Sequence, residues 1–367
     1  MRITKLGDIA NIITGPFGSQ LHKEDYVEHG IPVIMPQNIA DRRVDENNIA
    51  QISERDYQRL KRYATQKYDL VYARRGDVEK HAYIDHNKKA LCGTGCLRIR
   101  VTDTSVVPLY LSFYLCRPET RKWLVTHAVG SNMPNLNAGI LSEVPIELPD
   151  YATQVKVAKA LQRIEDKVSL NEKVNDNLAQ QAQLLFDFMF QDISGSKHIG
   201  DFIVPQRGTA LLSKDAIPGD VPVVAGGLEP ATYHNAANTV APVITISSSG
   251  ANAGFVNMWG VPVWSSDSSF IDFKMTPYVY FWYALLKRHQ NNIYKIQTGS
   301  AQPHIYPSHI ASLPVCDLNF EKVVDYTGQV TPLFSLIAKN YKEINQLRVL
   351  RDWLLPMLMN GQATISD

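Results

Sequence analysis

The sequence lacks long apolar runs and is poor in cysteine. No run of 18 or more apolar residues occurs in the 367 positions, which argues against a helix that crosses a membrane. The segment from Met1 to Ala10 has no apolar core of the kind that a secretory signal needs. These absences predict a cytoplasmic protein with no membrane partner. That compartment keeps thiols reduced, and four cysteines are present: Cys92, Cys96, Cys116 and Cys316.

The cysteines do not form a zinc signature. Cys92 and Cys96 could pair with His81 or His86, but three residues separate the cysteines and no second ligand pair follows. We therefore expect no metal site and interpret the cysteines as small buried apolar residues.

Motifs of two enzyme classes are also missing. No Walker-type loop occurs, which excludes ATP-driven work by this chain. A base-flipping methyltransferase needs a glycine turn after a strand and an Asn/Asp-Pro-Pro-aromatic motif, and neither is present. One catalytic hypothesis stays open. Asp267, followed by Asp272 and Lys274, resembles the acids and lysine with which metal-dependent nucleases hold magnesium and a water.

Net charge is low but unevenly distributed. The 37 Lys and Arg residues nearly balance the 36 acids, so the total charge of +1 indicates no particular partner. Between Arg55 and Arg100, however, twelve Lys or Arg residues face five acids. A solvated surface explains such a run as simply as a binding function does.

The strongest pattern is a heptad seam from Gln154 to Phe190. Apolar or small residues recur every three or four positions, with Asn171 and Asn175 in the two middle positions. As a helix this segment is about 55 Å long. Adding 169 to each seam position gives a second seam near the C-terminus, in which Asn340 matches Asn171. We expect this matched pair of buried asparagines to set the register of two antiparallel helices.

The globular segments before the two seams repeat as well. The loop VGSNMPNLN (129–137) corresponds to TGSAQPHIY (298–306), again 169 positions apart, and Leu6-Gly7-Asp8 corresponds to Ile199-Gly200-Asp201. Pattern breaks in the second seam predict a kink or restart at Thr331-Pro332 and an end at Pro356. In the first segment the sequence predicts strands and one helix: Ile31 to Met35, Leu70 to Ala73 and Leu97 to Val101 as strands, and Leu109 to Thr126 as helix.

The predicted fold is α+β, with two tandem mixed modules separated by two long antiparallel coiled-coil helices and related by a pseudo-twofold axis. We expect a first module over residues 1–150, a central helix over 151–193, a second module over 194–318 and a C-terminal helix over 319–367. A chain of this length is too long for a single ordinary core.

This order of parts resembles the DNA specificity (S) subunit of type I restriction-modification systems, in which two target-recognition domains alternate with two spacer helices. The matching phrases are LGDIANIITG (6–15), GIPVIMPQNI (30–39), ITISSSGANAGFV (244–256), VWSSDSSFI (263–271) and TGSAQPHI (298–305). The resemblance implies a non-catalytic, sequence-specific DNA-binding subunit that reads a bipartite asymmetric target. Its two modules would read short runs of bases roughly 34 Å apart.

The resemblance also directs attention to DNA-binding side chains. Lys and Arg would contact phosphates, and small polar side chains would contact base edges. The candidates in the first module are Arg74, Arg75, Lys80, His81, Lys88, Lys89, Asn132, Asn135 and Asn137. The second module is nearly neutral, with six basic and six acidic residues from Gly200 to Ser300, and its candidates are Ser248, Ser249, Asn252, Ser300, Gln302 and His304.

The expected partners are double-stranded DNA, two methyltransferase subunits and restriction (translocase) subunits. S-adenosylmethionine, magnesium and ATP would belong to those partner subunits, and none to this chain. Two alternatives remain: a stand-alone endonuclease that uses Asp267, Asp272 and Lys274, and a coiled-coil scaffold whose modules bind protein.

Overall fold

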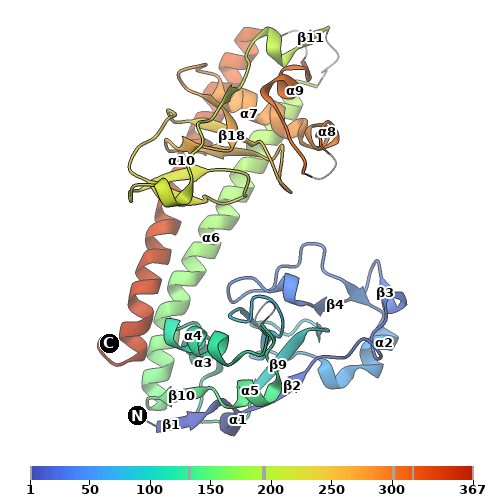
Figure 1. Ribbon diagram of the computed structural model, residues 1–367, viewed down its shortest axis with the longest axis vertical. Coiled ribbons are helices and arrows are strands. Elements are labelled where there is room, and N and C mark those ends of the chain that lie inside the picture. The colour runs from blue at the N-terminus through green and yellow to red at the C-terminus, as the bar shows by residue number, and fades with distance from the viewer. Residues whose placement is uncertain (1, 131–133, 192–195, 300–301, 316–317, 366–367) are drawn as a thin grey trace. The chain divides into compact units, whose positions relative to one another are not determined.

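The computed structural model describes residues 2–130, 134–191, 196–299, 302–315 and 318–365. The chain divides into two compact units. Unit 1 comprises residues 1–166 and 347–367, and unit 2 comprises residues 167–346. Each unit combines one mixed module with parts of two long helices, α6 (Tyr151–Met189) and α10 (Phe320–Met359) (Figure 1). We call the globular parts that precede α6 and α10 module 1 and module 2.

Module 1 is built from three small sheets. An antiparallel pair joins β1 to β10, a second sheet has the order β2-β9-β6-β7, and a third has the order β3-β5-β4-β8 with β4 and β8 parallel. The strands are β1 (Arg2–Lys5), β2 (Ala10–Thr14), β3 (Tyr26–Val27), β4 (Ile31–Ile34), β5 (Gln51–Ile52), β6 (Leu70–Ala73), β7 (His81–Tyr83), β8 (Leu91–Cys92), β9 (Cys96–Val101) and β10 (Pro145–Leu148). The helices are α1 (Leu6–Ile9), α2 (Glu54–Arg59), α3 (Pro108–Tyr114), α4 (Pro118–His127) and α5 (Ala138–Ser142).

Module 2 repeats this plan in sequence order. The pair β11-β19 corresponds to β1-β10, the sheet β12-β18-β15-β16 to β2-β9-β6-β7, and the sheet β14-β13-β17, with β13 and β17 parallel, to β5-β4-β8. Its strands are β11 (Lys197–His198), β12 (Gln206–Arg207), β13 (Val221–Val224), β14 (Thr232–His234), β15 (Val243–Ser247), β16 (Val256–Trp259), β17 (Trp264–Ser265), β18 (Ser268–Asp272) and β19 (Pro314–Val315). Its helices are α7 (Val279–Arg288), α8 (Gln290–Lys295) and α9 (Pro307–Ala311).

Both long helices complete the core of each unit. The core of module 1 includes Leu161 from the start of α6 and Leu355 and Leu358 from the end of α10. The core of module 2 includes Phe186 from the end of α6 and Tyr326 from the start of α10. The apolar seam of each helix is therefore shared between the partner helix and a module, and burial of this surface is the main stabilising contribution.

The two long helices pack antiparallel within each unit. In unit 2, Tyr326 Oη donates a hydrogen bond to the Ala182 carbonyl (3.1 Å), and Asn340 Nδ2 donates to Asn175 Oδ1 (2.8 Å). Asn171 Nδ2 donates instead to Glu343 Oε2 (2.8 Å). The α+β class and the long antiparallel helices agree with the prediction, and the matched asparagines are both buried, each with a partner of its own.

The predicted restart at Thr331-Pro332 and the predicted end at Pro356 were wrong, because α10 continues through both sites. A helical proline presses against the carbonyl four residues earlier. The residue four positions earlier is Gly328, where an added Cβ atom would meet no other atom within 4 Å. Pro332 itself is exposed. Val330 and Phe334, which flank the proline, are buried against module 2 and hold the helix together.

Two further predictions concern the cysteines and the membrane. Cys92 and Cys96 are buried apolar residues, as expected, and burial raises the pKa of Cys92 to about 12. Across the described part of the chain, none of the helices combines the length and the apolar character that crossing a bilayer requires.

Candidate nucleic-acid interface

Each module carries a short loop that its own backbone closes. In module 1, Val129 and Asn135 exchange two backbone hydrogen bonds, Val129 N to Asn135 O (3.0 Å) and Asn135 N to Val129 O (2.9 Å). In module 2, Thr298 and His304 do the same at 3.0 and 2.8 Å. Both loops carry a glycine in the left-handed region at the second position, Gly130 with φ 103° and Gly299 with φ 93°. The described ends of the two repeated phrases thus have the same backbone structure.

A turn supports each loop. It follows β6 in module 1 and β15 in module 2. The Leu136 N–H donates to the Arg74 carbonyl in module 1, and the Ile305 N–H donates to the Ser248 carbonyl in module 2, both at 2.9 Å. The next residues, Arg75 and Ser249, form isolated β-bridges with Asn135 and His304. Each turn then ends in a left-handed glycine, Gly76 or Gly250. We call each turn together with its loop a reading site, after the DNA-reading role that the sequence predicts for it.

The reading site of module 1 is cationic. Arg74 Nε donates to Asn135 Oδ1 and to the Leu136 carbonyl, both at 3.2 Å, and its guanidinium lies 5.8 Å from the ring centre of Phe17. Arg75 is exposed. Phe17 is 56% exposed on a segment that starts at Gly15, where a Cβ atom would collide with the Gly93 carbonyl. The site therefore presents two arginines, an amide and an exposed ring.

The reading site of module 2 uses a different set of side chains. Ser249 Oγ donates to the Asp267 carboxylate, which also accepts from Arg207 Nη2 (2.9 Å). The His304 and Tyr306 rings are nearly parallel, with centres 6.2 Å apart, and Tyr306 is 46% exposed. Gln302 is exposed and Asn252 is half-buried. This site offers neutral donors and acceptors around a single ion pair.

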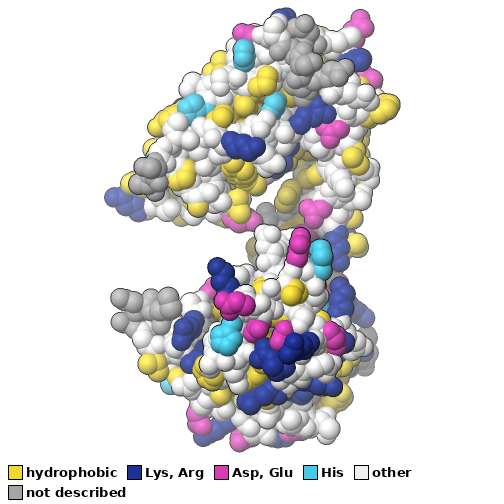
Figure 2. Space-filling model, turned by 90° about the vertical axis from the view of Figure 1, so that its right-hand side faces the viewer, with side chains coloured by type: hydrophobic (Ala, Val, Ile, Leu, Met, Phe, Trp, Pro, Cys, Tyr) yellow, Lys and Arg dark blue, Asp and Glu magenta, His cyan; other side chains and the backbone are white. Residues whose placement is uncertain are grey.

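The remaining predicted cations of module 1 lie outside this hydrogen-bonded site. Lys80 pairs with Asp77 (2.8 Å), Lys89 with Glu54 (2.8 Å), and Lys88 lies 3.9 Å from Glu46. Figure 2 shows Lys and Arg side chains lying among Asp and Glu side chains on one face of this unit. The six side chains of the three pairs Lys80–Asp77, Lys89–Glu54 and Lys88–Glu46 are at least half exposed. Exposed pairs of this kind are weak and exchange partners readily, so the lysines can still turn to phosphates.

Three of the predicted site residues have structural roles. His81 is 2% exposed, stacks on Tyr72 and shares a hydrogen bond with Ser112 Oγ (2.9 Å), so its prediction as a DNA-contacting residue was wrong. Ser248 is fully buried, which contradicts the same prediction for its side chain. Asn137 is the N-cap of α5 and accepts the Ile140 N–H (2.8 Å). Asn132 and Ser300 lie outside the described residues.

Part of the positive run between Arg55 and Arg100 belongs to the core. Arg100 forms two hydrogen bonds with the Asp69 carboxylate at 2.8 and 2.6 Å, and Arg98 donates to the carbonyls of Arg62 and Ala64. Arg98 and Asp69 are almost completely buried. A count of charges along the sequence therefore overstated the positive surface.

Sequence reasoning missed Tyr306, in the loop of module 2, and two neighbours of the reading sites, Phe17 and Arg207. A weak signal for Phe17 existed, since an aromatic between Pro16 and Gly18 sits in a turn where a core residue is unusual. Arg207 precedes Gly208, whose Cβ would collide with the Ser265 carbonyl just as Gly15 packs on Gly93. This correspondence becomes visible only when the two modules are compared in space.

The nuclease hypothesis does not fit the geometry. Asp267 directly precedes β18 and Asp272 is its last residue, so the two lie about 16 Å apart along an extended strand. The buried Asp272 carboxylate accepts the N–H groups of Val240 (2.9 Å), Lys274 (3.1 Å) and Met275 (3.2 Å), so it shapes the backbone. Within the described ranges no three His, Cys, Asp or Glu side chains gather in a way that could hold a metal ion.

Comparison with known proteins identifies the family. Residues 1–180 match the family model of the Type I restriction modification DNA specificity domain. The MjaIX specificity subunit of Methanocaldococcus jannaschii is 22% identical over 428 residues, across 100% of this chain and 94% of that protein. Over its whole length the chain is therefore similar to the type I restriction-modification specificity subunits. The HindI specificity subunit of Haemophilus influenzae is 26% identical over 133 residues, which span 35% of this chain and 29% of that subunit.

A solved structure supports the fold of this specificity subunit. The type I S subunit from M. genitalium gives a TM-score of 0.56 at 17% identity, across 97% of this chain and 95% of that one. Specificity subunits leave catalysis to partner subunits, so this chain is a non-catalytic subunit of a type I restriction-modification system.

Proposed function

We propose that this specificity subunit reads a bipartite, asymmetric DNA target, with one half read by each module. The observation that carries the proposal is the pair of reading sites. They share backbone closure, supporting turn and left-handed glycines, but they differ in nearly every side chain that they expose. Two sites with the same backbone arrangement but different exposed side chains are suited to bind two half-sites of different base sequence.

Module 1 combines phosphate contact with base contact. Arg75 and the lysines of the surface pairs supply the salt-dependent, sequence-independent part of the affinity. Arginine can also bind guanine with two hydrogen bonds, and the Asn135 amide can form hydrogen bonds with the edge of adenine. Phe17, exposed beside the Arg74 guanidinium, offers an apolar surface for a base or a thymine methyl group.

Module 2 reads mainly through neutral groups. Gln302 is the candidate for adenine, because its amide donates and accepts at the spacing of the adenine edge. The His304 and Tyr306 rings provide polar tips and flat surfaces, and Arg207 supplies the nearby positive charge. We expect phosphate contacts to contribute less in this half, since the module is nearly neutral, with six basic and six acidic residues from Gly200 to Ser300.

The long helices carry the partner subunits in this proposal. On α10, Val349, Leu350 and Trp353 are 70%, 41% and 59% exposed, and their spacing places them on one side of the helix. Exposed apolar residues grouped in this way are typical of protein interfaces. We propose that they help bind two methyltransferase subunits, which restriction subunits then join. S-adenosylmethionine, magnesium and ATP are cofactors of those partners, and this chain uses none.

The test is to co-express the chain with the methyltransferase subunit of its own system in a host without DNA methylation and to map every modified base. Wild type should give one two-part motif. Gln302→Ala should reduce methylation about tenfold at sites that carry one particular base pair in a single half, since a lost bidentate contact costs about 1–3 kcal/mol. Gln329→Ala, an exposed glutamine on α10 that bonds Asp325, is the matched control and should leave the motif unchanged.

Two outcomes would contradict the proposal. A complex that co-purifies but methylates no sequence motif would favour the protein-binding scaffold. A motif in which Gln302→Ala changes both halves equally would show that the modules do not read separately.

A further inference from the structure

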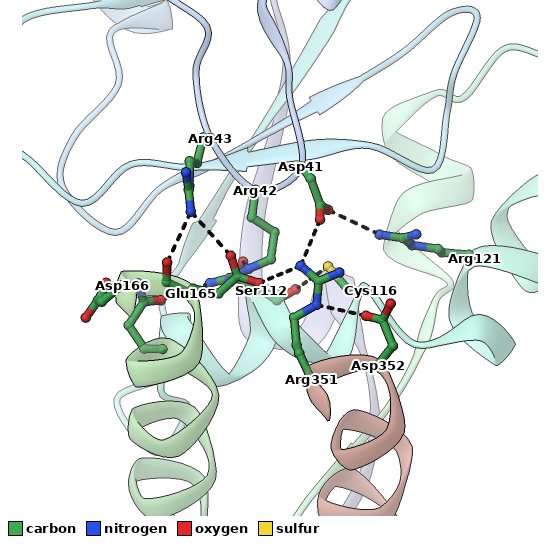
Figure 3. Close-up of polar contacts among 11 residues, drawn as sticks. Asp41, Arg42, Arg43, Ser112, Cys116, Arg121, Glu165, Asp166, Arg351 and Asp352 are labelled. Atoms are coloured by element: carbon green, nitrogen blue, oxygen red, sulfur yellow. Dashed lines mark hydrogen bonds and ion pairs between the residues drawn. The ribbon is translucent and has the colours of Figure 1, made fainter. Parts of the chain in front are cut away.

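A three-residue turn connects module 1 to both long helices within unit 1. Asp41, Arg42 and Arg43 lie between β4 and β5, and all three contact a helix (Figure 3). The Asp41 carboxylate accepts from Arg351 Nη1 on α10 (3.2 Å). Arg43 Nη2 donates to both the carbonyl (3.3 Å) and the carboxylate (3.4 Å) of Glu165 on α6.

The middle residue of this turn is buried and has an unusual backbone. Arg42 is 8% exposed, its guanidinium lies 3.4 Å from the ring centre of Phe113, and it donates to Ser112 Oγ (3.0 Å) and Gln162 Oε1 (3.3 Å). Burial lowers its pKa. Its φ of 57° lies in the left-handed region, which non-glycine residues rarely adopt. In an extended strand Arg42 would point away from its neighbours, and the left-handed turn lets all three side chains reach the helices.

A direct ion pair closes the network between the helices. Arg351 Nη1 binds Glu165 Oε1 at 2.7 Å, and Glu165 is 7% exposed. Glu165 and Asp41 therefore each bind two arginines, since Asp41 also pairs with Arg121 of α4 at 3.5 Å. A cavity of about 750 Å³ borders Asp41, Arg121, Glu165 and Arg351, which leaves one side of the network open to solvent.

Module 2 uses a different chemistry at the corresponding place. The helix repeat of 169 residues matches Glu165 with Phe334 and Arg351 with Ala182. The Phe334 ring stacks on Tyr280 with centres 4.5 Å apart and planes at 3°, and it meets the edge of Tyr283 at 5.7 Å. Ala182 is buried against the same core. At this place in the repeat, module 1 therefore has an ionic network and module 2 has packed rings.

We propose that the Asp41–Arg43 turn is the anchor of module 1, and that Arg351 and Glu165 are positioning residues for recognition of the first half-site. The proposal rests on the proposed reading of DNA by two modules. Ion pairs are directional and fix an orientation, whereas apolar packing tolerates small rotations. Loss of the network should therefore let module 1 tilt on its helices. Recognition of the distance between the half-sites would then relax, and the second half would still be read normally.

The test uses the complete complex with its methyltransferase subunit and DNA whose unread central segment is varied by one base pair. Arg351→Met keeps the length of the aliphatic stem and removes the charge. We expect the DNA concentration for half-maximal methylation to rise about tenfold at the native target, with kcat within about twofold. Targets with a central segment one base pair longer or shorter should gain methylation. A purely structural role would lower the amount of active complex, and hence kcat, without changing this spacing preference.

Two further variants serve as controls. Lys167→Met removes another charge shared by α6 and α10, the pair with Glu343 at 3.5 Å, and should leave spacing preference unchanged. Arg351→Lys keeps the charge but loses the planar fork, and should relax spacing less than Arg351→Met. If Arg351→Met forms no complex, Arg351→Lys alone decides the question.

The anchor proposal is overturned if the decisive variant retains the native spacing preference and the native half-maximal DNA concentration. A different failure belongs to the proposed function. If wild type itself shows no two-part motif, the reading of DNA by two modules is wrong, and the anchor loses its basis with it.

Discussion

Burial of His81 makes the stability of module 1 depend on pH. The surrounding core, aided by the positive charges of Arg42 and Arg121, lowers the pKa of His81 from 6.5 to about 3. Between these values the unfolded chain binds a proton that the folded chain does not bind, so stability is complete above about pH 6.5 and falls as pH decreases. At pH 5 the loss from this one group is about 2 kcal/mol, or 1.36 kcal/mol for each pH unit below 6.5.

The variant His81→Gln isolates this contribution. Gln keeps a polar group within reach of Ser112 but does not titrate. Hydrogen exchange of peptides that cover β6 and β7 at pH 7 and pH 5, corrected for intrinsic rates, reports the opening of module 1 without interference from module 2. Wild type should lose about 2 kcal/mol more than the variant over this range. Contributions from the rest of the chain are common to both proteins and cancel in the difference. Equal pH dependence in the two proteins would refute the assignment of a neutral, buried His81.

Two further predictions concern buried polar groups. Asp69→Asn leaves Arg98 and Arg100 without their carboxylate and should destabilise module 1 by about 3–5 kcal/mol, measured by the same exchange of β6 and β9 amides; a change below about 1 kcal/mol would contradict the proposed role. Asn340→Leu alone should destabilise unit 2 by about 1–3 kcal/mol, because the buried Asn175 amide then loses its partner. The double change Asn175→Leu with Asn340→Leu should restore the lost stability, measured by urea unfolding followed by circular dichroism at 222 nm. A double variant as unstable as Asn340→Leu alone would contradict the reasoning.

The long helices could be predicted from the sequence because their signal is repeated over many turns. The seam from Gln154 to Phe190 corresponds to α6, which runs from Tyr151 to Met189, and the offset of 169 places α10 within one residue at each end. The strand predicted from Leu70 to Ala73 agrees with β6. The single helix predicted from Leu109 to Thr126 is instead divided into α3 and α4, because Pro118 starts a new helix after Arg117.

The site could be predicted only in part. The two loops were found because they are duplicated, whereas their supporting turns were recognised as a pair only in the structure. Burial of individual side chains was not visible in the sequence. His81 and Arg98 stand in a charged run and look exposed, but they alternate with apolar neighbours in β7 and β9 and point into the core. The Asp41–Arg43 anchor also escaped notice, since its partners on α6 and α10 lie more than a hundred residues away.

The shared cores have a consequence for protein synthesis. Module 1 leaves the ribosome well before Leu355, Leu358 and Met359, which close its core, have been made. Its apolar surface therefore stays partly uncovered until the last turns of α10 have been synthesised, and a message truncated near codon 350 yields a first module that cannot complete its fold. Removing the last turns of α10 should damage module 1 before module 2.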